Sequence, residues 1–201
     1  MKIIIKATDA QKQELQEQNF VRPEIEFVND FRNLEADFYF DLSFDEKNPN
    51  FEINSNPVFV NAVSTTLKDL PENYIRLNAW NGFLKRREWE IAARKNHYAA
   101  VTECMEFLGL QFQFCPDIPG LIAARVIATI INEAYYTLNE NISTKEAIDT
   151  AMKLGTNYPY GPFEWANKIG LAKVELLLQS MLKEDQRYEI SELLIQEAKE
   201  R

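Results

Sequence analysis

The stretch DIPGLIAAR at residues 117–125 decides the fold of this chain, together with AIDTAMKLG at 147–155 and YPYGPFE at 158–164. Before the first block, short apolar runs alternate with short segments of helical pattern. After it, the spacing of apolar residues is helical throughout. Apolar residues recur at helical spacing from Leu121 to Leu138, in a stripe too wide for one exposed face. We expect this helix to lie centrally, either in the fold or at a subunit interface.

Composition restricts the class of protein. A chain of 201 residues that is 46% hydrophobic is globular, and its net charge of −9 argues against a nucleic-acid or anionic-membrane partner. No apolar run approaches the ~18 residues that cross a bilayer. Residues 1–6 are too short for a signal-peptide core. Cys104 and Cys115 have no metal-binding spacing and are expected to be buried free thiols, as in a cytoplasmic protein.

The first half of the chain predicts a parallel sheet with short helices. Thr8 and Gln11 form a capping box for a helix that continues to about Gln18, and Asn96 can cap another helix that ends at Gly109. Residues 48–57, rich in Asn and Pro, predict a loop. Strands are expected at residues 3–5, 25–28, 37–42, 58–60, 87–93 and 111–115.

The second half predicts helices only. Residues 143–146 (STKE) form a capping box for a helix that Gly155 would stop, and Pro162 suits the first turn of the next. Residues 171–182 and 190–198 supply the remaining helices. The change of texture near Pro116 divides the chain into an α/β domain, residues 1–115, and a helical domain, residues 116–201.

A dinucleotide site needs glycines directly after the first strand, where backbone N–H groups approach the pyrophosphate. Residues 6–10 (KATDA) contain no glycine and place Asp9 where a diphosphate would lie, and all six glycines occur at Gly82 or later. An NAD site of the usual kind is therefore not expected. Residues 1–60 are interpreted as a reduced half-domain kept for folding, with a remodelled ligand pocket as the alternative.

The three helical blocks, in this order and spacing, resemble the C-terminal domain of the 3-hydroxyacyl-CoA dehydrogenase family. The resemblance implies a truncated Rossmann-like parallel sheet without its glycine-rich loop, followed by the helical C-terminal-type domain of that family. It also implies NAD as the family's cofactor, although no cofactor site is recognisable in this sequence, and a homodimer formed through the helical domain. An acyl-CoA or another small molecule would be its ligand, bound between the two domains.

Two family motifs can be matched to the first half of the chain. Residues 62–67 (AVSTTL) fit the family's S-N-T-S-S-L, which puts Thr65 on the serine that positions the substrate hydroxyl, next to Ser64. The alternative is that these hydroxyls only cap the strand end. Residues 76–82 (RLNAWNG) fit the block G-L-H-F-F-N-P, so that Asn81 matches and Asn78 replaces the catalytic His. Glu90 then falls on the Glu that orients the His.

These replacements remove most of the chemistry that the resemblance implies. The family's His accepts the hydroxyl proton while hydride leaves, and a carboxamide such as Asn78 has no basic lone pair near neutral pH. Loss of a positioned general base costs about 10²–10⁴ in rate.

The family's substrate-binding Asn is replaced by Ala124. Glu90 would act as a base if buried, or be salt-bridged or solvent-facing; His97, the only His, is expected to be a surface or capping residue.

Three functions follow as hypotheses. The first is a dehydrogenase-like protein without NAD-dependent activity that binds an acyl-CoA-like ligand. The second is an active oxidoreductase of fatty acid metabolism that works with a partner carrying the nucleotide half, or an acid–base enzyme that uses Glu90. The third is a dimeric helical interaction or scaffold protein. Binding of acyl-CoA panels would distinguish them, because a ligand of the native state raises its stability.

Overall fold

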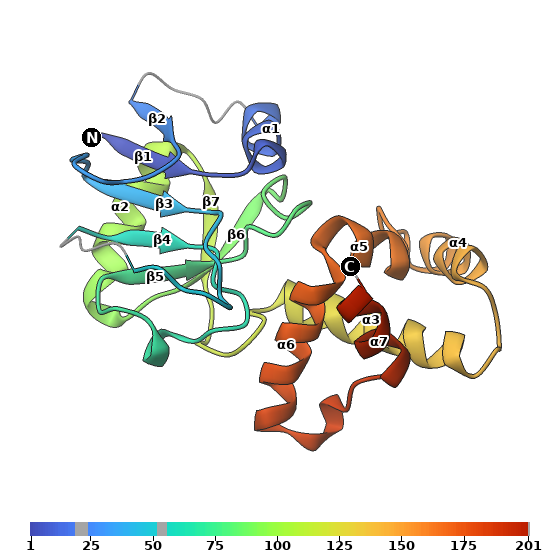
Figure 1. The fold of residues 1–201 in the computed structure, drawn as a ribbon. Helices are drawn as coiled ribbons and strands as arrows, with labels where there is room; N and C mark the ends of the chain where they lie inside the picture. The colour runs from blue at the N-terminus through green and yellow to red at the C-terminus, as the bar shows by residue number, and fades with distance from the viewer. Residues whose placement is uncertain (19–23, 52–55, 201) are drawn as a thin grey trace. The chain divides into compact units, whose positions relative to one another are not determined.

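The computed structural model describes residues 1–18, 24–51 and 56–200 of the chain. The chain forms two compact units, Met1–Leu121 and Ile122–Arg201. In Figure 1 the strands belong to the first unit, and the second unit consists of helices and their connections. Among the described residues, no helix is both long and apolar enough to traverse a bilayer.

One mainly parallel sheet forms the first unit. Within the described residues it has seven strands in the order β2-β1-β3-β4-β5-β6-β7. Neighbouring strands from β2 to β5 are parallel, β5 and β6 are antiparallel, and β6 and β7 are parallel. The strands are β1 (Ile3–Lys6), β2 (Ile25–Val28), β3 (Phe38–Asp41), β4 (Val58–Val60), β5 (Tyr74–Leu77), β6 (Glu88–Ala92) and β7 (Gln111–Phe114).

The predicted fold class, an α/β sheet followed by a helical domain, is confirmed, and so are the six predicted strands. The sequence did not predict β5, which lies between β4 and β6. Its pattern is interrupted by Arg76, a residue type that is almost never fully buried unless it is paired. Of the predicted loop 48–57, residues 52–55 lie outside the described residues.

Alternating side chains give the sheet two apolar faces. One face, with Ile3, Ile5 and Phe40, packs with the buried residues of α1 (Asp9–Glu17) and α2 (Tyr98–Leu108). The other face carries Ile4 and Tyr39 and packs against loop side chains, among them Phe31, Phe44 and Leu70. By the same alternation, Arg76 of β5 and Glu90 of β6 lie on this second face.

The helix termini of the first unit follow the sequence with one exception. Thr8 caps α1 in the predicted capping box, and α2 ends at Gly109, whose φ of 69° is left-handed. The predicted cap at Asn96 is wrong, because a short 3₁₀ turn, Lys95–His97, precedes α2 and puts His97 at its N-cap. The Asn96 amide instead donates to the Glu72 carboxylate at 3.3 Å.

The second unit contains α3 (Ala123–Asn139), α4 (Lys145–Thr156), α5 (Pro162–Ile169), α6 (Leu171–Glu184) and α7 (Glu192–Glu200). Helix α3 packs against α5, α6 and α7, so it is the central helix of this unit, as its wide apolar stripe predicted. Pro162 occupies the first turn of α5 as predicted.

The ends of α4 differ slightly from the sequence prediction. Thr144 rather than Ser143 is its N-cap, and the Thr144 hydroxyl accepts a hydrogen bond from the Ala147 N–H at 3.3 Å. The helix passes Gly155 and ends at Asn157, whose φ of 55° is left-handed. Asn tolerates this conformation, so a second candidate stop lay two residues beyond the glycine.

Asp149 of α4 caps the N-terminus of α5. Its carboxylate accepts hydrogen bonds from the backbone N–H groups of Phe163 at 2.8 Å and Glu164 at 3.2 Å. A Cβ built on Gly161 would lie 2.3 Å from Asp149 Oδ1 and 2.5 Å from Asp149 Cα. The glycine of the YPYGPFE block is therefore required by the close approach of α4, which explains part of the block in structural terms.

We expect Gly161→Ala to lower the free energy of unfolding by about 1–3 kcal/mol, because the new methyl group overlaps the Asp149 backbone and side chain. Gly155→Ala is the matched control, since a Cβ there meets nothing within 4 Å, and alanine at this helical position is favourable by up to about 1 kcal/mol. Urea denaturation of both variants measures the difference. Equal destabilisation by the two substitutions would contradict this account.

Candidate functional site

The turn from β1 to α1, where a dinucleotide fold binds pyrophosphate, is closed by the chain's own side chains. Gln11 Oε1 accepts from the Thr8 N–H at 2.9 Å, and Thr8 Oγ1 accepts from the Gln11 N–H at 3.3 Å. Asp9 is exposed in the first turn and adds negative charge there. These groups occupy donors that would otherwise face an anion, so the residues present do not fit a pyrophosphate.

Helix α1 supports the loop that follows β5. Gln11 Nε2 donates to the carbonyl oxygens of Leu42 at 2.7 Å and Ala79 at 2.8 Å, and Gln11 is buried. One turn later, Glu14 Oε1 accepts from the Gly82 N–H at 2.6 Å. The helix that would bind a nucleotide thus holds the residue 79–82 segment in place.

The topological switch point of the sheet lies between β1 and β3, the position at which open α/β sheets bind ligands. Lys6 and Asp41 end these two strands, and Lys6 Nζ lies 3.1 Å from Asp41 Oδ2. Burial raises the pKa of Asp41, while the Lys6 ammonium opposes the shift. An internal ion pair therefore occupies the usual position of a ligand.

The sheet register keeps the positions that match the family's His and Glu opposite each other. Leu77, the last residue of β5, pairs with Ile91 of β6, so Asn78 directly follows and Glu90 directly precedes the two members of this pair. Asn78 is buried, and its Oδ1 accepts from the Trp80 N–H at 3.1 Å. Its Nδ2 has no hydrogen-bond partner within the part of the chain that the structure describes. Asn78 thus offers a donor to a ligand, not a base.

Glu90 is buried on β6, with 2% of its surface exposed. Its Oε1 accepts a hydrogen bond from Arg86 Nη1 at 2.5 Å, an ion pair in which Arg86 is partly exposed. This is the salt-bridged alternative that the sequence left open for Glu90. The Glu90 carboxylate is therefore engaged by a side chain of its own chain.

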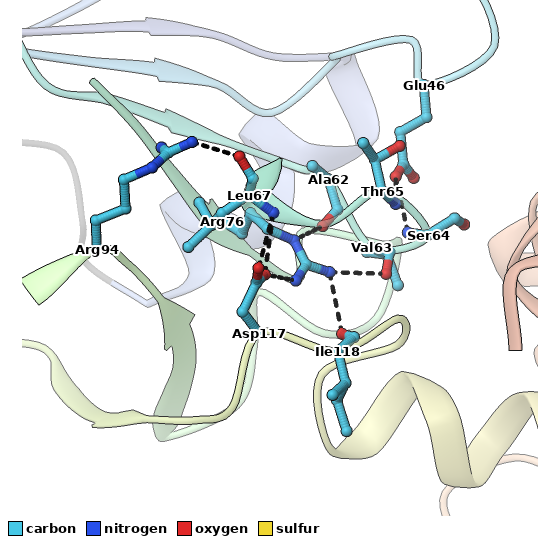
Figure 2. Close-up of polar contacts among 10 residues, drawn as sticks. All are labelled: Glu46, Ala62, Val63, Ser64, Thr65, Leu67, Arg76, Arg94, Asp117 and Ile118. Atoms are coloured by element: carbon cyan, nitrogen blue, oxygen red, sulfur yellow. Dashed lines mark hydrogen bonds and ion pairs between the residues drawn. The ribbon is translucent and has the colours of Figure 1, made fainter. Parts of the chain in front are cut away.

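Thr65 and Ser64 contact a carboxylate that the sequence did not single out. The backbone N–H groups of Ser64 and Thr65 donate to Glu46 Oε1 at 2.7 Å and 2.6 Å (Figure 2). Burial raises the pKa of Glu46, and hydrogen bonds from the backbone and side chain of Thr65 and the backbone of Ser64 oppose that rise. Glu46 therefore occupies the backbone donors of the turn whose Thr65 the family resemblance matches to the substrate-positioning serine.

The other candidate residues are dispersed. Asn81 is half-buried in the loop after β5, and Ala124 is fully buried in α3 of the second unit. His97 lies at the start of α2, where its Nε2 is 3.0 Å from the Glu72 carbonyl oxygen. His97 thus has a capping position, as expected, and its ring contacts the Glu72 backbone.

The sequence missed Arg76, a fully buried arginine of the first unit. It is fully buried and donates to the carbonyl oxygens of Ala62 at 2.9 Å, Val63 at 3.1 Å and Ile118 at 3.2 Å. It also forms an ion pair with Asp117 (Figure 2). Its signal was the matched block RLNAWNG, which has arginine where the family block begins with glycine.

Asp117 connects this arginine to the neighbouring turn. Its two carboxylate oxygens accept from the Leu67 N–H at 3.1 Å and 3.0 Å, and the Leu67 carbonyl accepts from Arg94. Burial lowers the pKa of Arg76, and the Asp117 carboxylate opposes that shift. The charge of Arg76 is therefore held by its partners, and the segment at Asp117 and Ile118 is fixed to the ends of β4 and β5.

Comparison with known proteins gives a family match in the helical unit. Residues 120–200 match the family of the 3-hydroxyacyl-CoA dehydrogenase, C-terminal domain. The chain is 40% identical over 84 residues to 3-hydroxyadipyl-CoA dehydrogenase of Escherichia coli, covering 41% of this chain and 18% of that protein. It is 39% identical over 107 residues to 3-hydroxybutyryl-CoA dehydrogenase of Bradyrhizobium diazoefficiens, covering 51% of this chain and 36% of that protein. The chain thus matches about a fifth to a third of the length of these relatives.

The similarity in fold covers nearly the whole chain. The crystal structure of (S)-3-hydroxybutyryl-CoA dehydrogenase from Ralstonia eutropha aligns with a TM-score of 0.72 at 18% identity, covering 97% of this chain and 92% of that one. The fold and the three blocks define a dehydrogenase-type sheet unit followed by a helical domain. Residues 120–200 are similar to the C-terminal domain of the 3-hydroxyacyl-CoA dehydrogenase family, and the chain as a whole has the fold of a solved member.

We expect Arg76→Met to lower the free energy of unfolding by about 3 kcal/mol, because it removes the guanidinium donors from three carbonyls and the positive partner of the Asp117 carboxylate. Arg32→Met is the control, since the Arg32 side chain is 81% exposed beside Asp30 and an exposed pair contributes less than about 1 kcal/mol. Urea denaturation compares the two. A loss for Arg76→Met no larger than for Arg32→Met would contradict the assignment.

Proposed function

We propose that this protein is a 3-hydroxyacyl-CoA dehydrogenase-like protein that binds an acyl-CoA-like ligand and has no NAD-dependent dehydrogenase activity. Asn78 is the observation that carries the proposal. It stands where the family has its general base, its Oδ1 is engaged by the Trp80 N–H, and its buried Nδ2 has no partner among the described residues. A buried donor of this kind costs free energy unless an acceptor, such as a thioester or hydroxyl oxygen, satisfies it.

The closed β1–α1 turn supports the second half of the proposal. Thr8 and Gln11 satisfy each other, Asp9 repels an anion, and the Lys6–Asp41 pair fills the switch point. Without bound NAD there is no hydride acceptor, so the missing base and the missing cofactor site lead to the same conclusion. The free thiols of Cys104 and Cys115 support a cytoplasmic location.

We expect purified protein to show no oxidation of NADH with acetoacetyl-CoA at ordinary enzyme rates. In thermal unfolding, an acyl-CoA ester should raise Tm, while NAD and NADH should not, because only a ligand of the native state stabilises it. Asn78→Ala should reduce the rise by removing the Nδ2 donor. Asn96→Ala, which removes an exposed amide paired with Glu72, is the control.

Two outcomes would count against this function. Turnover of NADH would show that another group replaces the base. Absence of any CoA-dependent rise in Tm, with Asn78→Ala like the wild type, would favour the scaffold hypothesis.

We also propose that the protein forms a homodimer through its helical unit. Several apolar side chains of this unit are exposed, including Ile122 at 42%, Val126 at 48%, Ile142 at 67% and Leu154 at 83%. Ile122 and Val126 lie one helical turn apart at the start of α3, and neighbouring exposed apolar side chains favour an interaction surface. A second copy of the chain is the partner that the family resemblance implies.

We expect Val126→Glu to shift the dimer toward monomer, because a buried charge at an apolar interface must be desolvated. Light scattering at several protein concentrations measures the change. Ala99→Glu, at an exposed position of α2 in the first unit, is the control and should leave the dimer intact. A monomeric wild-type protein would contradict the proposal directly.

A further inference from the structure

The turn after β4 presents two backbone N–H groups to one carboxylate oxygen. Ser64 and Thr65 donate to Glu46 Oε1 at 2.7 Å and 2.6 Å, distances typical of charge-assisted hydrogen bonds (Figure 2). Two donors from adjacent residues therefore converge on one carboxylate oxygen.

The same turn is held from its other side by Arg76. The carbonyl oxygens of Ala62 and Val63 accept from the guanidinium, and the Val63 carbonyl also accepts from the Gly120 N–H at 2.7 Å. Because these carbonyls are fixed, the following N–H groups point away from Arg76, toward Glu46, as Figure 2 shows. The donors are thus preorganised and need no rearrangement to bind an anion.

The surroundings favour negative charge at this position. Glu46 and Arg76 interact electrostatically, and the buried positive charge of Arg76 lies behind the turn. Ser64 is buried, with 5% of its surface exposed. Its Oγ has no hydrogen-bond partner among the described residues. A further donor is therefore available close to the two N–H groups.

We propose that the turn formed by Ser64 and Thr65 is a carboxylate-binding site, which Glu46 occupies from within the chain. A small carboxylic acid, in its ionised form, binds there when the Glu46 side chain is removed or displaced. Glu46 acts as a tethered competitor, since a group on the same chain reaches an effective concentration in the millimolar range. This inference concerns a ligand chemistry distinct from the acyl-CoA proposal and does not depend on it.

The test uses the full-length, ¹⁵N-labelled chain and follows the Ser64 and Thr65 amide resonances during titration with sodium acetate against sodium chloride of equal ionic strength. Glu46→Ala should show a saturable acetate-dependent shift of both resonances, with a dissociation constant in the millimolar range. Wild type should show at least tenfold weaker binding, because Glu46 competes. Asp45→Ala, which removes an exposed neighbouring carboxylate, should behave like wild type.

Stability provides a second readout if Glu46→Ala weakens the fold. Acetate should then raise the Tm of Glu46→Ala well above the effect of chloride, and it should not do so for Glu46→Gln, whose carboxamide oxygen still fills the position. Absence of a saturable shift and of any acetate-specific rise in Tm for Glu46→Ala would overturn the proposal. Equal acetate binding by wild type and Glu46→Ala would overturn the role of Glu46 as occupant.

Discussion

The geometry of the first unit depends on the buried guanidinium of Arg76. Removing a charge from water costs several kcal/mol unless partners compensate it, so its three carbonyl acceptors and Asp117 must stay in place while the unit is folded. These acceptors come from the end of β4 and from the segment that follows β7. One side chain of β5 thereby fixes two distant parts of the chain to each other and orients the turn that meets Glu46.

The chain's own side chains take the contacts that the family resemblance reserves for ligands. Gln11 satisfies the first turn of α1, Glu46 accepts from Thr65, and the Trp80 N–H engages the oxygen of Asn78. In each case a polar group that would cost free energy if left bare has an internal partner. The donor nitrogen of Asn78 is a different case, because it is buried with no such partner in the described residues.

Local patterns predicted most elements, whereas long-range contacts decided what the sequence could not show. The six predicted strands are short β-branched or aromatic runs, and Thr8, Gly109 and Pro162 act through neighbours a few residues away. Strand β5 was missed because Arg76 is compatible with a central strand only through partners far along the chain. Gly161 belongs to a block that the sequence singled out, but the side chain and backbone that exclude a Cβ there, those of Asp149, lie on another helix. The candidate residues Asn78 and Glu90 were brought together by the sheet register, while Glu46 had no signal in any motif.

The closed β1–α1 turn and the loop that carries Asn78 are physically coupled. Asn78 follows the last residue of β5, so a histidine at position 78 would place a base where the family's block has one. Hydride transfer would also require an open first turn in α1, and that turn is closed by Gln11. Gln11 in turn holds the Leu42 and Ala79 carbonyls, the latter adjacent to Asn78. Replacing Gln11 to open the turn would therefore also release the Leu42 and Ala79 carbonyls, so the closed turn and the loop that follows β5 depend on the same side chain.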